Sequence, residues 1–332
     1  MTSSSKIAVI GSNSFSGSSF VDFALEKGLD VIGMSRSAEP HDVLLPYKWN
    51  KRKDAFQFHA LDINNDLDAI MALLNKEKPG YVVNFAAQSM VGQSWDFPEH
   101  WFQTNAVSTV MLHNALRRVD YLDRYVHVTT PEVYGSTGEF ITEDTPFNPS
   151  TPYAVSRAAG DMSLKTFVDA YDFPAVSTRA ANVYGPGQQL YRIIPRTIFF
   201  ILTDKKLQLQ GGGVSKRSFI HMRDVSDATL KIMENGKNGE TYHISTNEIV
   251  TIRGLVEKIC AMMGVKFEEH VEVSEDRLGK DQAYILNSDK IRKALGWSNK
   301  ISLEQGLEET IKWVRDNKNA LESVPQNYVH KK

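Results

Sequence analysis

Cysteine is the residue of which this chain has least. Cys260 is the single cysteine among 332 residues, so no disulfide can form within the chain. It lies in a stretch whose apolar residues, among them Leu255, Ile259 and Met263, have helical spacing, and this pattern favours an inert core thiol over a reactive one. A chain without disulfides suits a reducing compartment, and we expect a cytoplasmic protein.

Long apolar segments are also missing. No stretch approaches the roughly 18 consecutive apolar residues from which a membrane-spanning helix is recognised. Residues 1–6 lead directly into a strand-like segment without an apolar signal region. We therefore expect no interaction with a membrane.

An excess of basic charge is absent as well. Lys and Arg total 38 against 40 Asp and Glu, so the chain has no basic surplus with which to bind nucleic acid. Neither an internal repeat nor a low-complexity tract is present, and we expect no metal site. The composition, 42% apolar and 23% charged, is that of an ordinary globular protein with one large domain or two moderate ones.

What the sequence does contain is a regular alternation of strand-like and helix-like segments. The expected strands are 6–10, 31–34, 56–61, 81–85, 125–129 and 175–180. The expected helices are 16–26, 67–74, 98–119 and 152–171. This alternation predicts a Rossmann-type α/β fold, a doubly wound parallel sheet with helices on both faces, over residues 1–182.

The alternation breaks into shorter pieces after Asn182. Further helices are expected near 195–202 and at 225–234, 253–263 and 302–316. The last of them opens with a capping box formed by Ser302 and Gln305. Residues 183–332 therefore predict a smaller C-terminal α/β lobe, although strand-like 240–244 is expected to return to the first domain.

A loop with two glycines joins the first expected strand to the first expected helix. In this position the backbone can approach a pyrophosphate, whose charge the helix N-terminus favours. The common pattern has a glycine where Ser14 stands, and a loop with two glycines could also be a plain turn. Its position favours a dinucleotide site formed by Gly11, Asn13, Ser14, Phe15, Ser16 and Gly17.

The end of the second expected strand has no acidic residue. A carboxylate there would bind the adenosine ribose of NAD, whereas an arginine with hydroxyls favours the 2′-phosphate of NADP. The sequence has Ser35, Arg36 and Ser37, so we predict NADP, with NAD as the alternative cofactor. A solvated arginine on a loop would be the purely structural interpretation.

Two other strand ends are expected to contact the same cofactor. Asp62 and Ile63, after the third strand, are placed to meet the adenine. Phe85, Ala86 and Ala87, after the fourth, provide small or flat residues where the backbone must pass the ribose and the nicotinamide.

Reactive side chains occur in two later stretches. Thr130 and Glu132 follow the strand expected at 125–129, whereas Tyr153 and Arg157 lie four residues apart on a helix and share a face. A phenol beside a fixed cation has a lowered pKa and can exchange a proton with an alcohol that is being oxidised. Such a pair alone would more often be a surface contact, but the preceding dinucleotide loop favours a catalytic role.

With these stretches the sequence resembles the extended short-chain dehydrogenase/reductase family and, within it, the nucleotide-sugar 4,6-dehydratases. The resemblance covers nearly the whole chain. It is carried by residues 11–17, 84–89, Asn105, 130–135, 153–157, 179–186, 217–224, 276–281 and 295–297. Residues 11–17, 87–89 and 130–132 look most similar to a bacterial branch that acts on GDP-N-acetylglucosamine in legionaminic acid synthesis.

The resemblance implies a lyase reaction on a nucleotide-linked hexose. Tyr153, as phenolate, would take the proton of the sugar 4-hydroxyl while a hydride leaves carbon 4 for the nicotinamide, and Thr130 would bond to the same oxygen. Glu132 would then remove the proton on carbon 5, water would leave from carbon 6, and the hydride would return there. The product would be a 4-keto-6-deoxy sugar.

Two other functions remain open at this point. A 4-epimerase or 4-reductase of the same family needs only the first step, but epimerases typically lack a carboxylate at the position of Glu132. A non-catalytic NADP-binding regulator is the alternative from another class. Pro131 and Arg157 motivate it, because many dehydratases have an aspartic acid at the first position and the usual residue at the second is lysine.

The resemblance also implies residues that bind the substrate. Besides Thr130 and Glu132, the candidates are Ser89, Asn182, Arg192, Arg217 and Arg277. Arg217 and Arg277 would bind the diphosphate, since a guanidinium can bind phosphate oxygens in a bidentate manner. A surface or turn role is the alternative for each of them.

A homodimer is implied through the helices at 98–119 and 152–171. In the family the corresponding helices pair with their copies. Apolar residues suit that interface, although an internal core would use them equally well: Val107, Val110, Met111, Leu164, Phe167 and Val168.

Overall fold

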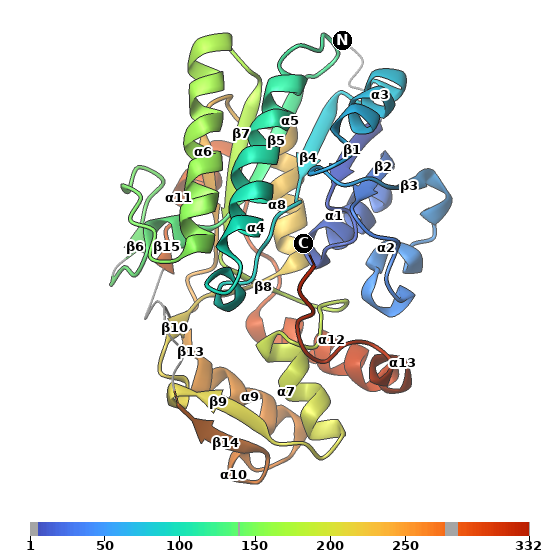
Figure 1. Cartoon of the computed structure of the whole chain (residues 1–332). Helices are drawn as coiled ribbons and strands as arrows, with labels where there is room; N and C mark the ends of the chain where they lie inside the picture. Colours follow the sequence, from blue (N-terminus) through green and yellow to red (C-terminus); the bar gives the residue numbers. More distant parts are fainter. Residues whose placement is uncertain (1–5, 139, 276–284, 332) are drawn as a thin grey trace.

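The centre of the molecule is a parallel sheet of seven strands. The computed structural model describes residues 6–138, 140–275 and 285–331 (Figure 1). The strand order is β12-β7-β5-β4-β1-β2-β3, and all neighbours are parallel. The strands are β1 (Lys6–Ile10), β2 (Asp30–Ser35), β3 (Phe56–Ala60), β4 (Tyr81–Asn84), β5 (Arg124–Thr129), β7 (Ala175–Ala180) and β12 (Thr241–Ile244). The predicted Rossmann-type fold is confirmed.

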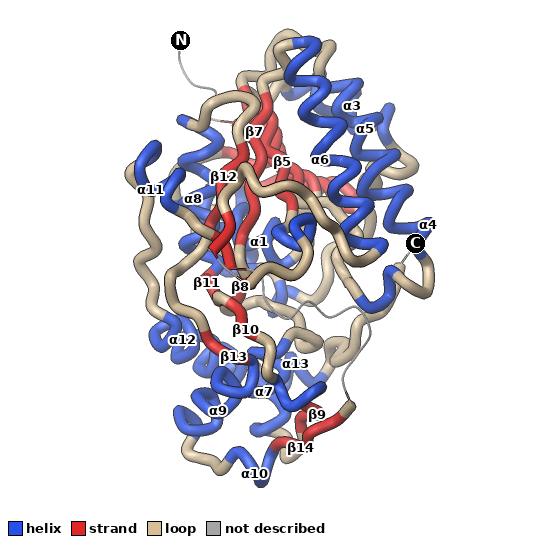
Figure 2. Tube along the Cα trace, turned by 90° about the vertical axis from the view of Figure 1, so that its left-hand side faces the viewer, coloured by secondary structure: helices blue, strands red, loops and turns tan. Residues whose placement is uncertain are grey.

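Helices cover both faces of this sheet (Figure 2). On one face lie α3 (Leu67–Glu77), α5 (Thr109–Leu116) and α6 (Pro152–Tyr171); on the other lie α1 (Phe15–Glu26), α8 (Met222–Asn235) and α11 (Asp289–Leu295). Successive side chains of a strand point to opposite faces. Ile7 and Val9 of β1 accordingly join the core beneath α1, whereas Ala8 and Ile10 join the core beneath α3.

The long helix predicted at 98–119 is present from Pro98 to Leu116, but it is a composite and not a regular α-helix throughout. It consists of α4 (Pro98–Phe102), a π-helical segment η4 (Gln103–Ser108) and α5, which ends at Leu116. A π-bulge shifts the side chains that follow it and often occurs near functional sites. Here it brings the backbone oxygen of Asn105 so close to α6 that a Cβ on Gly160 would lie 2.6 Å from it.

The C-terminal lobe lies below the sheet in Figure 1. Its main helices are α7 (Ile193–Leu202), α9 (Ile252–Met263), α12 (Leu303–Asp316) and α13 (Lys318–Glu322), and β9 (Leu207–Gln210) pairs with β14 (Val271–Ser274). Shorter elements are α2 (Pro46–Trp49), α10 (Phe267–His270), β6 (Phe140–Ile141), β8 (Asn182–Tyr184), β10 (Lys216–Arg217), β11 (Phe219–His221), β13 (Val250–Thr251) and β15 (Ile285–Leu286). Since β12 belongs to the main sheet, the division at residue 182 stays a prediction.

Three local predictions can be compared with the structure directly. The capping box of Ser302 and Gln305 at the start of α12 is confirmed, with both of its hydrogen bonds present. Cys260 is buried, and its burial raises the pKa of the thiol, as expected for an inert core residue. Over the residues that the structure describes, no helix has both the length and the apolar character needed to span a membrane.

Candidate active site

The glycine loop lies at the point where the strand order reverses, between β1 and β4. Gly11 has a φ of 83°, and a Cβ there would lie 2.6 Å from the backbone nitrogen of Ala86, so only glycine fits this crossing. Ser14 caps α1: its hydroxyl accepts from the Gly17 amide at 3.0 Å and donates to the Gly11 oxygen at 2.7 Å. Ser14 therefore has a structural role that a glycine would not supply.

The end of β2 is bonded to this loop. The amide of Asn13 donates to the Ser35 hydroxyl at 2.9 Å, and its side chain donates to the Ser37 oxygen at 3.1 Å. An acid that the sequence prediction did not weigh, Glu39, is also close. Its carboxylate accepts from the hydroxyl of Tyr47, which donates to Asn13 as well.

The residues expected at the adenine and the nicotinamide lie at neighbouring strand ends. The carboxylate of Asp62 accepts from the amide of Asn64 at 3.0 Å, and Ile63 is buried. Phe85 is buried after β4, and Ala86 donates to the Asn84 side chain at 2.9 Å. The carboxyl ends of β1 to β4 therefore bring the residues predicted for the cofactor from the first four strand ends to one edge of the sheet. The other two residues predicted to contact the cofactor, Tyr153 and Arg157, lie on α6.

Glu132 lies in a short 3-10 helix, η5 (Pro131–Tyr134), that follows β5, and Thr130 directly precedes this helix. Thr130 is its N-cap and accepts from the Glu132 amide at 3.3 Å. Pro131 occupies the first helical position, where its fixed φ and missing amide hydrogen cost nothing. Pro131 therefore replaces the expected acid with a residue that starts the helix. Glu132 is the next residue of this helix, two positions after Thr130.

Tyr153 and Arg157 face this turn from the N-terminal half of α6. The side chain of Tyr153 is hydrogen-bonded to Thr130. The charges of Arg157, Glu132 and Arg192 are close enough to influence the pKa of its phenol. The expectation of a lowered pKa is wrong for the protein alone: burial raises the pKa of the Tyr153 phenol, and the charge of Arg157 offsets only part of this effect. Arg157 is itself buried and donates to the backbone oxygen of Val128.

One turn further along α6, a buried carboxylate supports these residues. Asp161 accepts from Arg179 at 2.7 Å and from the Thr129 hydroxyl at 3.0 Å, and it lies 3.2 Å from Nε2 of His127. Burial by itself would raise the pKa of this carboxyl, but the charge of Arg179 and the His127 contact hold it well below its usual range. The sequence prediction missed Asp161; its spacing of four residues from Arg157 on a helix was the available signal.

The residues predicted to bind the substrate are less closely grouped. Ser89 is exposed, whereas Arg217 is buried and donates to the Lys216 oxygen. The side chain of Asn182 donates to the Ser218 oxygen at 3.3 Å. Arg192 is the member of this set whose charge reaches Tyr153. Arg277 lies outside the described residues.

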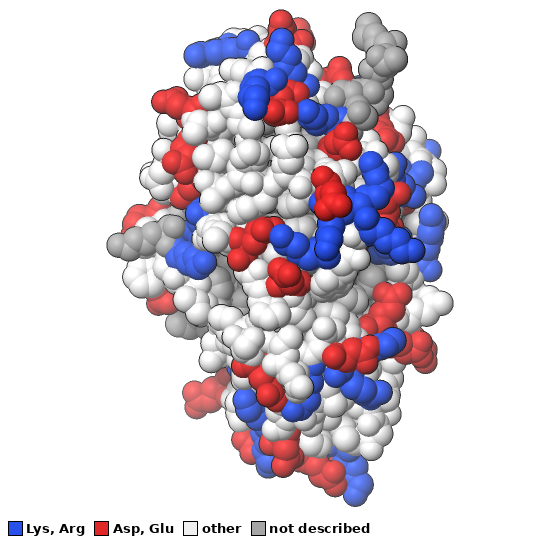
Figure 3. Space-filling model, turned by 90° about the vertical axis from the view of Figure 1, so that its right-hand side faces the viewer, with Lys and Arg blue, Asp and Glu red and all other residues white. Residues whose placement is uncertain are grey.

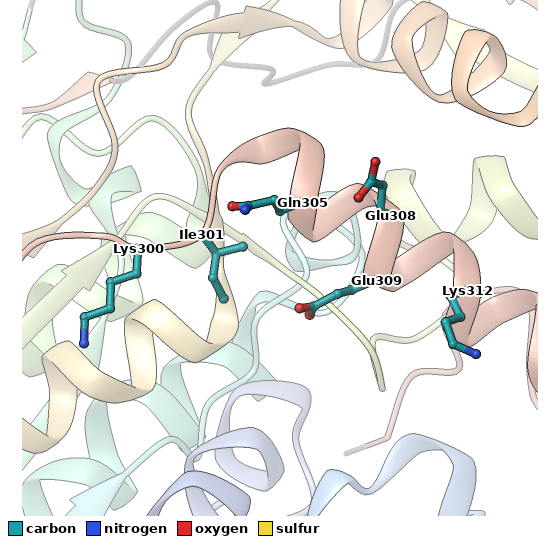
Figure 4. Close-up of a pocket in the computed structure, with 6 residues that line it drawn as sticks. All are labelled: Lys300, Ile301, Gln305, Glu308, Glu309 and Lys312. Atoms are coloured by element: carbon teal, nitrogen blue, oxygen red, sulfur yellow. The ribbon is translucent and has the colours of Figure 1, made fainter.

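A polar hollow elsewhere on the molecule can be distinguished from this site. It runs along α12 and is lined by Lys300, Ile301, Gln305, Glu308, Glu309 and Lys312 (Figure 4). It contains none of the residues predicted for the cofactor or the substrate and lacks a phenol or hydroxyl. On the face shown in Figure 3, basic and acidic side chains are interspersed, so no extended basic surface occurs there.

Comparisons with known proteins agree with this arrangement. A family model described as GDP-mannose 4,6 dehydratase matches residues 9–310. A dTDP-glucose 4,6-dehydratase of Xanthomonas campestris pv. campestris is 31% identical over 95% of this chain and 95% of its own length.

Solved structures of a dehydratase and of an epimerase have the same fold. DesIV, a dTDP-glucose 4,6-dehydratase from Streptomyces venezuelae with NAD and TYD bound, has a TM-score of 0.87 at 30% identity and covers 95% of this chain and 98% of its own. A UDP-glucose 4-epimerase from Thermotoga maritima has a TM-score of 0.84 at 25% identity and covers 94% and 99%.

The fold and the Thr, Glu and Tyr side chains at the ends of β5 and α6 define an extended short-chain dehydrogenase/reductase. Within that class, the chain belongs to the nucleotide-sugar 4,6-dehydratase family. It is an enzyme that removes water from a nucleotide-linked hexose.

Proposed function

We propose that this enzyme is a 4,6-dehydratase of GDP-N-acetylglucosamine that uses NADP. The observation that carries the reaction is the convergence of Tyr153, Thr130 and Glu132 at one place, with Arg157 beside the phenol. The choice of sugar rests on the amino-acid sequence of residues 11–17, 87–89 and 130–132, which resembles that of the bacterial branch acting on GDP-N-acetylglucosamine. The relatives above are named for dTDP-glucose, which is therefore the second substrate to test.

The residues of the glycine loop fit a dinucleotide. The loop precedes a helix of 12 residues with no acidic side chain in its first turn, so the free amides and the helix dipole can attract a pyrophosphate. Gly11, Asn13, Ser14, Phe15, Ser16 and Gly17 would hold it. A nicotinamide bound here would supply the hydride chemistry, first as acceptor and then as donor.

The preference for NADP rests on the end of β2. Ser35, Arg36 and Ser37 offer hydroxyls and a guanidinium for a 2′-phosphate. Glu39 would repel that phosphate if it were unpaired, but its carboxylate is bonded to Tyr47 and to Lys48. DesIV was solved with NAD, so cofactor choice is a point on which the two enzymes would differ.

In the proposed mechanism the protein moves three protons. Tyr153 takes the proton from the sugar 4-hydroxyl, and Thr130 keeps the phenol and that oxygen in line. The ketone formed at carbon 4 acidifies carbon 5, from which Glu132 removes a proton. Glu132 passes that proton to the 6-hydroxyl, which leaves as water. When carbon 6 is then reduced, a proton from solvent is added to carbon 5 and re-forms its C–H bond, and Tyr153 releases its own proton to solvent.

Pro131 determines how the elimination is shared. Since proline has no side-chain proton, Glu132 serves as base at carbon 5 and as the carrier of the proton that the leaving hydroxyl needs. This dual use suits a syn elimination, in which both groups depart on the face that Glu132 occupies. Ser89, Asn182, Arg192, Arg217 and Arg277 would bind the sugar and the diphosphate.

A substrate screen tests the proposal. The protein is incubated with NADP and with GDP-, UDP- and dTDP-linked glucose, mannose and N-acetylglucosamine. The molecular masses of the products are then determined by mass spectrometry. Loss of one water from GDP-N-acetylglucosamine alone supports the full proposal, and loss from another sugar corrects the substrate. An unchanged mass with a new 4-epimer would instead favour an epimerase, which the similarity to the Thermotoga enzyme makes the second candidate.

We also propose a homodimer through the helices at 98–119 and 152–171. Leu164 is buried in the core, but Val107 and Met111 are exposed, as are Val155 and Met162 on α6. An apolar groove beside α6 is lined by Phe147, Pro149, Val155, Ala158, Ala159 and Met162. Sedimentation of the wild type and of Met162→Glu tests the proposed homodimer.

A cytoplasmic location stays a prediction from the sequence.

A further inference from the structure

The segment at residues 325–331 connects the two parts of the molecule. Just before it, Leu321 and Val324 are buried in the core of the C-terminal lobe. In Figure 1 the chain then rises to the mark C, which lies in front of the sheet near α4 and α1. The segment has no helix and no strand, and half-buried and exposed residues alternate along it, as in an extended chain that lies on a surface.

The last residue of this segment, Lys331, is hydrogen-bonded to residues that follow two different strands of the sheet. The backbone oxygen of Lys331 accepts from Nε2 of Gln88 at 2.7 Å and from Nη1 of Arg36 at 3.0 Å. Gln88 follows β4 and Arg36 follows β2, and β1 lies between these two strands in the sheet. The Lys331 peptide group therefore spans the end of β1, where Gly11 begins the glycine loop.

An aromatic pocket holds the preceding residue. The ring of His330 stacks on Phe97 at 5.0 Å and on Trp101 at 5.1 Å between ring centres. Its Nε2 lies 2.8 Å from Nδ1 of His100. Trp101 is fully buried whereas Phe97 is exposed, so the pocket that receives His330 lies where the packed interior around α4 meets the surface.

A second aromatic residue of the segment faces the substrate side. The ring of Tyr328 meets the edge of Tyr191 at 5.6 Å, and its hydroxyl donates to Oε1 of Gln88 at 3.4 Å. Tyr191 precedes Arg192, whose charge acts on Tyr153. The segment thus runs from the substrate side of the site to the adenosine side.

We propose that residues 325–331 form a wall of the dinucleotide site and close over the adenosine half of the bound cofactor. The inference rests on the proposed function in that NADP is the ligand. Lys331 supports it further, since its ammonium group lies 3.3 Å from the hydroxyl of Ser37, beside the Arg36 proposed to bind the 2′-phosphate. A wall tied by His330 and Gln88 shields the cofactor from water and must part for its release, so it slows dissociation.

The test measures how fast the enzyme releases NADPH. Dissociation is followed by the loss of nicotinamide fluorescence when excess NADP is added to the full chain and to a variant that stops after Gln326. We expect release at least tenfold faster from the shortened chain, with a dissociation constant weakened to a similar degree. Equal release, or tighter binding that would show the segment competing with the cofactor, overturns the inference.

Point variants make the test independent of how the shortened chain folds. His330→Ala, which empties the aromatic pocket, should speed release severalfold, whereas Val329→Ala, at an exposed neighbour, should leave it unchanged. Backbone hydrogen exchange at residues 327–331 should slow when NADPH is added, and exchange that does not respond contradicts the proposal. If the full chain binds no NADPH, the proposed cofactor is wrong; if it binds and no variant has an effect, only the wall is wrong.

Discussion

At the residue scale, the catalytic phenol is held between burial and a neighbouring cation. Burial raises the pKa of Tyr153, and Arg157 is the first charge that opposes this rise. Even with Arg157 beside it, the phenol of Tyr153 therefore has a pKa above its ordinary value in the protein alone. Arginine at position 157 preserves the charge expected of a lysine, although it turns one nitrogen toward Val128.

Removing that charge should move the pH dependence of the enzyme. In Arg157→Met the acid limb of the profile of kcat/KM against pH should shift upward by about one pH unit or more, because the phenol loses the cation that favours its ionised form. Arg157→Lys keeps the charge and should leave the limb close to that of the wild type. Profiles that coincide for all three proteins would show that Arg157 does not act on Tyr153.

The buried ion pair of Asp161 should contribute to the free energy of unfolding far more than an ion pair at the surface does. Asp161→Asn removes the negative charge that pairs with the buried Arg179, and a change of this kind costs about 3 to 5 kcal/mol. The free energy of unfolding in urea measures the loss. Asp169→Asn on the same helix is the control, since Asp169 pairs with Lys165 in solvent, where such pairs contribute about 1 kcal/mol or less. Similar losses for both variants would contradict the role of Asp161.

The candidate site could be predicted from the sequence where chemistry and spacing coincide. Tyr153 and Arg157 share a helix face, and Thr130 and Glu132 share a turn, so their proximity followed from local geometry. Asp161 and Glu39 were missed because their importance depends on partners far away in the sequence, Arg179 and Tyr47. The sign of the pKa change at Tyr153 was missed because burial is a property of the folded molecule.

At the element scale, the segments with a clear local signal were predicted best. The bounds of β1, β7 and α6 agree with the structure, because each has an apolar run or a capped helix start that is visible locally. The π-helical segment η4 was not predictable, since it depends on the packing of Asn105 against α6. The two-residue strands β6, β10, β13 and β15 form only by pairing with distant segments, so their sequences carry no signal.

The glycine loop is the element whose geometry is most restrictive. Gly11→Ala should lower stability by about 1 to 3 kcal/mol and weaken NADP binding, because the new Cβ would meet the backbone of Ala86 and the φ of 83° is strained for alanine. Thermal unfolding and a cofactor titration measure both effects. Gly92→Ala, where no atom lies within 4 Å of the added Cβ, is the control. A Gly11→Ala variant with unaltered unfolding and binding would contradict the loop geometry.

At the scale of the whole molecule, buried histidines link stability to pH. Burial lowers the pKa of His243 to about 3 and that of His113 well below its usual value. Both stay neutral in the folded chain but gain a proton in the unfolded chain below about pH 6.5, so the unfolded state binds more protons there. Stability is therefore complete above that pH and declines as the pH falls.

Unfolding in urea at several pH values measures this decline. Between pH 7.5 and pH 5 we expect the free energy of unfolding to fall by about 1 to 2 kcal/mol for each fully buried histidine. The variant His113→Phe should show a smaller fall than the wild type. A free energy of unfolding that stays constant over this range would contradict the burial of these side chains in neutral form.

The architecture as a whole was predictable because a parallel sheet with helices on both faces follows from strand and helix alternation. The position of residues 325–331 was not, since an extended segment without periodicity gives no indication of the surface on which it lies. Its contacts with Gln88 and Arg36 become apparent only once the sheet places β4, β1 and β2 side by side.

Glu132 carries the elimination without an acid at position 131, where the chain has proline. Glu132→Gln is incubated with NADP and with the nucleotide sugar identified by the screen. The molecular mass of the product is determined by mass spectrometry after a timed reaction. We predict that the wild type and a Glu308→Gln control lose one water per sugar, whereas Glu132→Gln loses none and still binds NADP as tightly as the wild type. Water loss by Glu132→Gln at a rate near that of the wild type would contradict this role of Glu132.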